Sequence, residues 1–399
     1  MNKQRLIAAA LTIAFAMTTL SCSALAEETE ASEWAAERAA AEQSRAASNE
    51  HLQRVLQRIA LRHDAEAAVL RFQLGPLEPL AACEQYRFSL GYRFQAEPAS
   101  EAEKLDCKAA EAEWRAWHLR AVLQAPDLDS THLFAAMGRG VAEGEIWDRF
   151  RDELYQREPL NPAVLALQLH DPRWQPSEAE LDDRLWEVAQ AGRPWRSYFG
   201  DSGRRLMQAM LSVPVTPDLI ETHKSNWENL SPAATHPQAL NPEQEARFAA
   251  AMLALGYHMA QVPAIGFQQL VNACHFQRQP ERSERRRQAC AALGQRMAEQ
   301  PELLIDWRIG AVIWRRALRA AGLDEAPALE QTRRSEWLLH LRYDFNREGE
   351  LEQIDALIDS TLRGETELDS LLGRLRDAGL DPLPPPDWLP TREGWDQLR

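Results

Sequence analysis

The chain has 399 residues, a formal net charge of −15 at pH 7 and 45% hydrophobic residues. The negative charge argues against nucleic acid as the main partner and against a generic anionic membrane surface. Behind residue 26 no apolar run approaches the length of a membrane span, so the mature chain is expected to be soluble.

Residues 1–26 have the features of an export signal. Lys3 and Arg5 form a positive head, an apolar stretch runs from Leu6 to Met17, and Ala24-Leu25-Ala26 supplies the small residues that signal peptidase requires. This pattern predicts cleavage after Ala26 and an oxidising location, either periplasmic or secreted.

A lipid anchor is the alternative at this end of the chain. Leu20-Ser21-Cys22 resembles a lipoprotein processing site, although Thr19 stands where that motif normally has leucine. Anchoring at Cys22 would attach the protein to a membrane, whereas cleavage after Ala26 would release it.

The rest of the chain reads as helix almost throughout. Prolines recur at intervals of one helix plus a loop, β-branched residues are sparse, and alternating strand patterns do not persist. We therefore expect an all-α fold, an array of antiparallel helix pairs that is α-solenoid-like or folded into a compact helical superhelix. The expected parts are an exposed or disordered lead (27–50), an N-terminal helical region (51–125), the helical array (126–380) and an extended Pro-rich tail (381–399).

Several helix boundaries are marked by capping residues. Ser177 with Glu180 forms a capping box. Asn241-Pro242-Glu243 is an N-cap followed by a first-turn proline and an acidic residue. Gly379 is expected to end the last helix.

Four cysteines follow the export signal, in two closely spaced pairs. Cys83 and Cys107 flank one break in the helical pattern, and Cys274 and Cys290 flank another. This spacing predicts two disulfides, Cys83–Cys107 and Cys274–Cys290, each joining the two arms of a helical hairpin. A metal or redox site is the alternative, but no C-x-x-C spacing supports it.

Two short motifs resemble parts of known functional signatures. Gly200-Asp201-Ser202-Gly203 resembles the serine-containing signature of trypsin-like proteases, but only over four residues and without the strands that would supply a histidine and an aspartate. We expect a helix start there, capped by Asp201 or Ser202. Gly138-Arg139-Gly140 lacks the preceding strand of a dinucleotide fingerprint and predicts a turn. No metal ligand set, cofactor or catalytic residue is predicted.

One basic cluster stands out in an acidic chain. Because arginine binds carboxylate or phosphate with two parallel hydrogen bonds, this cluster is a candidate anion-binding or partner-binding site. A solvated helix face balanced by nearby acids is the alternative. The cluster consists of Arg278, Arg282, Arg285, Arg286 and Arg287.

Two functions from different classes are compatible with these features. The first is an exported, non-enzymatic helical protein of the bacterial envelope that binds a protein or peptide, because no catalytic motif is present. The second is a cell-wall hydrolase that uses a carboxylate in an inter-helical groove. Acidic residues number 60, so a cluster such as Glu143, Glu145 and Asp148 identifies no particular pair.

Overall fold

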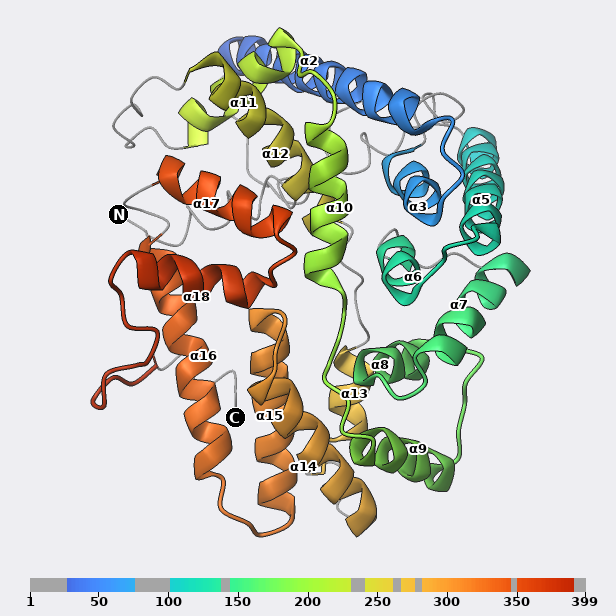
Figure 1. The fold of residues 1–399 in the computed structure, drawn as a ribbon, viewed down its shortest axis with the longest axis vertical. Helices are drawn as coiled ribbons and strands as arrows, with labels where there is room; N and C mark the ends of the chain where they lie inside the picture. The colour runs from blue at the N-terminus through green and yellow to red at the C-terminus, as the bar shows by residue number, and fades with distance from the viewer. Residues whose placement is uncertain are drawn as a thin grey trace. The chain divides into compact units, whose positions relative to one another are not determined.

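The computed structural model describes residues 27–75, 101–137, 144–230, 241–260, 267–276, 282–345 and 350–390. Over these ranges the chain forms sixteen α-helices and no strand (Figure 1). The prediction of an all-α protein is therefore confirmed. None of the described helices is long and apolar enough to cross a membrane.

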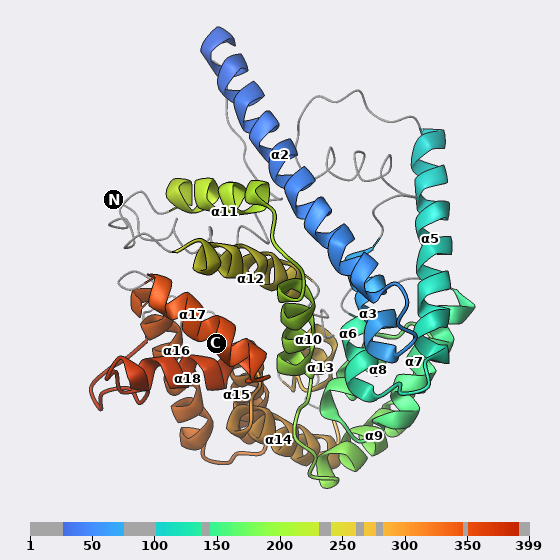
Figure 2. The same cartoon turned by 45° about the horizontal axis from the view of Figure 1, so that its top comes forward.

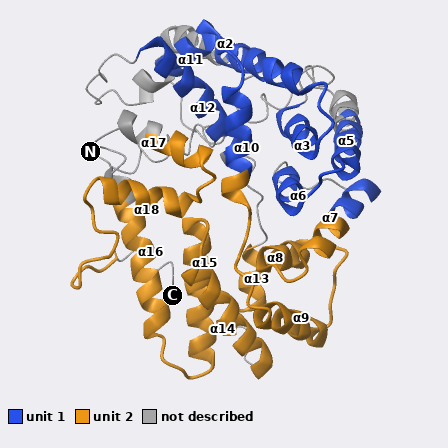
Figure 3. Cartoon of the chain, in the orientation of Figure 1, with its two compact units in different colours: residues 1–150, 202–262 blue, residues 151–201, 263–399 orange. Residues whose placement is uncertain are grey.

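Two compact units make up the chain, and each unit is assembled from two separate stretches (Figure 3). Unit 1 comprises residues 1–150 and 202–262, and unit 2 comprises residues 151–201 and 263–399. Two of the divisions fall inside the helices α7 (Glu145–Arg157) and α10 (Phe199–Leu211).

Unit 1 contains most of α10, the start of α7, and six further helices. These are α2 (Glu27–Ile59), α3 (Ala65–Leu74), α5 (Glu101–Gln124), α6 (Ser130–Met137), α11 (Pro217–Leu230) and α12 (Pro242–Ala260). Helix α2 packs on α11 and α3, and α11 lies beside α12 (Figure 2). The backbone N–H of Ala65 donates to Asp127 at 2.7 Å, and the Gln73 amide donates to the Ala135 carbonyl at 2.9 Å. These bonds attach α3 to the segments that follow α5.

Unit 2 contains the rest of α7 and eight further helices. These are α8 (Pro162–His170), α9 (Glu178–Gln190), α13 (Phe267–Ala273), α14 (Glu284–Glu299), α15 (Leu304–Ala320), α16 (Ala326–Phe345), α17 (Glu350–Leu362) and α18 (Glu367–Asp377). One cluster of its core joins the start of α15 to α16 and α18 through Leu304, Leu338, Leu341, Leu368, Leu371 and Leu375.

Helices α14 and α15 form a close antiparallel pair because glycines face each other between them. A Cβ atom added to Gly294 would lie 2.8 Å from the Gly310 carbonyl oxygen, and one added to Gly310 would lie 2.7 Å from the Ala298 backbone nitrogen. Real side chains do not approach so closely, so this helix pair requires the two glycines.

The predicted caps are present. Ser177 and Glu180 form the capping box of α9. The Asn241 side chain accepts the backbone N–H groups of Glu243 and Gln244 at 3.0 Å, and α12 begins at Pro242. Helix α18 ends at Asp377, and Gly379 follows with a φ of +69°.

The expected cap at Asp201 or Ser202 is wrong by three residues or more, since the cap position is Tyr198. Helix α10 begins at Phe199, so Gly200-Asp201-Ser202-Gly203 lies within its first turns. A Cβ atom added to Gly200 would lie 2.6 Å from the Gly364 carbonyl oxygen and 2.7 Å from that of Glu365. The glycine thus permits a close backbone contact rather than a catalytic turn.

The Cys274–Cys290 disulfide is confirmed and links the end of α13 to α14. Both cysteines are fully buried. It is the one disulfide among the described residues, rather than the two that were predicted. Cys83 lies outside the described ranges, and nothing is described of the Cys107 side chain, so the pairing of these two stays a prediction.

Candidate functional site

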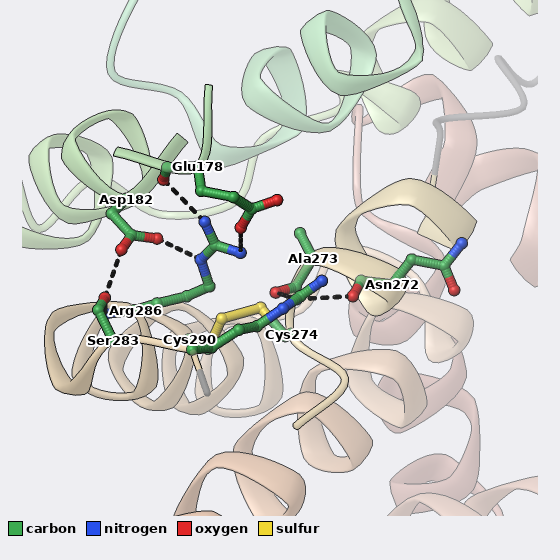
Figure 4. Close-up of a disulfide and its surroundings, with 9 residues drawn as sticks. Glu178, Asp182, Asn272, Ala273, Cys274, Ser283, Arg286 and Cys290 are labelled. Carbon is green, nitrogen blue, oxygen red and sulfur yellow. Dashed lines mark hydrogen bonds and ion pairs between the residues drawn. A yellow bond between two sulfur atoms is a disulfide. The ribbon is translucent and has the colours of Figure 1, made fainter. Parts of the chain in front are cut away.

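The predicted arginine cluster centres on Arg286, whose side chain is 1% exposed. Its guanidinium lies between two acidic residues of α9 (Figure 4). Nε donates to Asp182, Nη2 donates to the Glu178 carbonyl oxygen at 2.9 Å, and Nη1 pairs with the Glu178 carboxylate at 2.6 Å. The hydroxyl of Ser283 donates to the same Asp182. Arg286 is therefore buried, and its hydrogen bonds and ion pairs link α14 to α9.

The neighbouring arginines also contact acceptors within the chain. Arg282 donates to the carbonyl oxygens of Asn272 and Ala273, beside the disulfide. Arg285 pairs with Asp183 and lies 5.5 Å above the Trp186 ring, and Arg287 pairs with Glu284 at 2.9 Å. Arg278 lies outside the described residues.

These contacts separate the four described arginines into different roles. Arg286 has almost no surface left for a ligand, whereas Arg285 is 48% exposed at its side chain. Burying an arginine requires paired acceptors, and α9 provides them. Sequence spacing identified the cluster but not these partners, since Asp182 and Arg286 are more than 100 residues apart.

A second cluster brings three carboxyl groups to the starts of two helices of unit 2, α10 and α15. Glu302 accepts hydrogen bonds of 2.8 Å from the backbone N–H and the hydroxyl of Ser197, just before α10. Its own carbonyl oxygen accepts the Leu368 N–H of α18 at 3.3 Å. Glu367 accepts the Leu304 N–H of α15 at 3.1 Å, and Asp306 accepts the Leu303 N–H at 3.0 Å. Carboxylates satisfy the free N–H groups at helix starts.

Asp306 is the most buried member of this carboxyl cluster. Its side chain is inaccessible, and its Oδ1 atom has no hydrogen-bond partner. Burial raises the pKa of Asp306 to about 8, and the nearby Glu302 and Glu367 contribute to that rise. Burial also raises the pKa of Glu302, against the hydrogen bonds from Ser197. An isolated buried carboxyl is protonated at neutral pH because desolvation penalises its charge.

The acidic cluster predicted from the sequence at the start of α7 is more exposed than the carboxyl cluster around Asp306. Glu145 is exposed in the first turn of α7, and Asp148 is partly exposed. Glu143 lies outside the described ranges. Acidic residues at a helix start are stabilised by the helix dipole, so Glu145 and Asp148 have a structural explanation.

The C-terminal strap, defined here as residues 380–390, follows one face of α16. Arg333 donates to the carbonyl oxygens of Pro385 at 2.7 Å and Trp388 at 3.2 Å. Trp337 donates to the Asp381 carbonyl at 3.1 Å, and its ring meets that of Trp388 edge-on at 5.2 Å. This region is thus attached to its own helix, and sequence reasoning did not identify Arg333 or Trp337 as the residues that hold it.

The strap also displays apolar side chains to solvent. Leu380, Leu383 and Leu389 are 37%, 53% and 71% exposed, whereas Pro384 and Pro390 are buried.

Among the described residues, no group of three or more His, Cys, Asp or Glu side chains is arranged to hold a metal ion. Comparison of the chain with protein-family models, curated proteins and solved structures gives no significant match. The candidate sites therefore rest on the geometry of this chain alone.

Proposed function

We propose that this protein is an exported, non-enzymatic helical protein of the bacterial envelope that binds a protein or peptide partner. The observation that supports this proposal most is the C-terminal strap, whose main chain is held by Arg333 and Trp337 while Leu383 and Leu389 face solvent. A surface already ordered in the free protein loses little conformational entropy on binding. Exposed leucines on such a surface can supply apolar contact area to a partner.

From the export signal we expect the protein to be periplasmic or secreted after cleavage following Ala26. The alternative is a lipid anchor at Cys22. We further expect the helix pairs to stack as an array and Cys83 to pair with Cys107. Mass spectrometry of non-reduced peptides tests this pairing. A Cys83 thiol found free, or joined to Cys274, would contradict it.

Binding through the strap can be tested with matched leucine variants. We would compare proteins crosslinked to the wild-type chain, to Leu383→Asp/Leu389→Asp and to Leu323→Asp in an envelope extract. Leu323 is 60% exposed in the turn after α15 and serves as the control. A specific partner should be lost with the strap variant, retained with the control, and bind directly when purified. Equal recovery with all three chains would refute the proposal.

A cell-wall hydrolase is the second candidate function, and the described residues support it less. Within the described ranges, the two carboxyls with a raised pKa are Glu302 and Asp306. Both are engaged at helix starts, and Asp306 has no exposed surface. A general acid must come within hydrogen-bond reach of its substrate. Incubation of the purified protein with peptidoglycan tests this alternative directly, through the release of muropeptides.

A further inference from the structure

Two histidines with unsatisfied ring nitrogens lie between helices of unit 1. His51 comes from α2 and is fully buried. His223 comes from α11, the helix on which α2 packs. The two rings are close enough that a charge on His51 disfavours a charge on His223. We call this pair the α2–α11 histidine pair.

The contacts of His51 define its tautomer. Its Nε2 atom lies 3.0 Å from the carbonyl oxygen of Met210, near the end of α10. A carbonyl oxygen only accepts, so Nε2 carries the hydrogen and Nδ1 of the neutral ring is bare. This Nδ1 atom is buried and has no hydrogen-bond partner. A proton added there would therefore produce a buried cation whose new N–H has no acceptor.

His223 of α11 is partly exposed as a residue, but one of its ring nitrogens is enclosed. Its Nε2 atom is buried and also has no hydrogen-bond partner. Protonating both rings would place two positive charges near each other. Buried charges without partners are strongly unfavourable, and like charges add to this penalty.

The surrounding charged groups do not offset these charges. Burial lowers the pKa of His51, and the charge of Arg54 of α2 lowers it further. Arg54 is itself paired with Glu50 at 2.6 Å. On α11, Lys224 lies 3.9 Å from Glu245 of α12. Further ionisable residues of these helices are Arg45 and the exposed Arg58 of α2, the exposed Glu221 of α11, Arg204 and Arg205 of α10, and Arg247 and His258 of α12.

We propose that the neutral α2–α11 histidine pair keeps α2 packed at neutral pH, and that protonation of the two rings on acidification releases α2. The neutral rings fit between α2, α10 and α11, but the protonated rings do not. Release would uncover the buried apolar face of α2, which includes Leu52, Val55 and Ile59. An exported protein experiences the pH of its surroundings, and buried histidines are common pH switches.

The pH range follows from the direction of the shifts. Burial lowers the pKa of both histidines below 6.5, and that of His223 to about 4. The folded unit thus binds fewer protons than the unfolded chain. The stabilisation that depends on the neutral rings is fully present above pH 6.5 and is lost as the pH falls toward 4. Burial also lowers the pKa of His258 to about 4, so a test must separate release of α2 from opening of the whole unit.

Hydrogen exchange of the full-length mature protein provides that separation. Peptides of α2 should exchange at least about tenfold faster at pH 5 than at pH 7, after correction for intrinsic rates, which corresponds to one pKa unit of linkage or more. Peptides of α12 should remain protected at pH 5. Simultaneous exposure of α2 and α12 would overturn the proposal, because the unit would then open as a whole.

Variants test the two histidines directly. His51→Gln keeps a donor for the Met210 carbonyl and removes the titration, and His223→Leu removes the second ring. His63→Gln is the matched control, because His63 is an exposed histidine of the same unit, in the turn between α2 and α3. The double variant should keep α2 protected at pH 5, while the control behaves as wild type. If the double variant does not fold, His223→Leu alone should reduce the acid effect. An unchanged acid response in these variants would overturn the proposal.

Discussion

Glu302 and Ser197 lie 105 residues apart in the sequence, yet Oε2 of Glu302 accepts both the backbone N–H and the hydroxyl of Ser197 at 2.8 Å. This contact places a carboxyl group at the start of α10, while the Glu302 carbonyl binds the start of α18. The connection before α15 therefore satisfies N–H groups of two other helices. Unpaired N–H groups at buried helix starts would be strongly unfavourable.

Replacing Glu302 with alanine should destabilise unit 2. The N–H and the hydroxyl of Ser197 would lose their acceptor, and an unsatisfied buried donor costs about 1–3 kcal/mol. Glu302→Gln retains an acceptor oxygen and should lose less. Urea unfolding at pH 7 measures both changes, and equal stability of the two variants would contradict the role of the hydrogen bonds.

Asp306→Asn should alter how stability depends on pH. The pKa of Asp306 rises from 3.8 in the unfolded chain to about 8 when folded, so its contribution is complete below pH 3.8 and is lost as the pH rises through 8. Asparagine stays neutral, and the variant should therefore be more stable than wild type at pH 9. Urea midpoints at pH 5, 7 and 9 test this, with the exposed Asp387→Asn as control. Parallel decline of variant and wild type would count against a protonated Asp306.

Arg286→Met should be strongly destabilising although it adds no polar group. The arginine is buried against Asp182, whose side chain is only 15% exposed. Removing one partner of a buried ion pair costs about 3–5 kcal/mol, because the other charge is left uncompensated. Arg285→Met is the comparison, since the Arg285–Asp183 pair is exposed and should contribute less than about 1 kcal/mol. Thermal unfolding at pH 7 would show whether the two variants differ.

Gly294→Ala should disturb the α14–α15 pair. The new Cβ would lie 2.8 Å from the Gly310 carbonyl oxygen, which is backbone and cannot move aside cheaply. Forcing an extra methyl group into a packed interface costs about 1–3 kcal/mol. Gly373→Ala in α18 has open space around it and should be neutral or stabilising. Denaturant midpoints of the two variants provide the measurement.

Reduction of the Cys274–Cys290 disulfide should lower stability without changing the fold. The bridge closes a loop with a sequence separation of 16 residues, for which the chain-entropy model gives about 3 kcal/mol. A Cys274→Ala/Cys290→Ala variant should therefore melt at a lower temperature than the oxidised protein. Stability that is insensitive to reductant would show that the native packing, rather than the bridge, limits unfolding.

Local information in the sequence determined the helices and several of their ends. The capping residues Ser177 and Asn241 act within one turn of the chain, so their effect is visible in a short window of sequence. The same holds for Cys274 and Cys290, which lie on either side of one short break. The predicted start of α10 is wrong because Gly200 contacts the backbone of Gly364, and no residue near Gly200 in the sequence indicates this contact.

Only the tertiary structure decided which charged and polar side chains meet. Asp182 with Arg286, Ser197 with Glu302, and His51 with the Met210 carbonyl all join residues more than 100 positions apart. Helical periodicity shows which face of a helix is apolar, but it does not show which other helix covers that face. The partner is selected by packing of the whole unit, and that packing sets the burial that turns an ordinary arginine, aspartate or histidine into a candidate site.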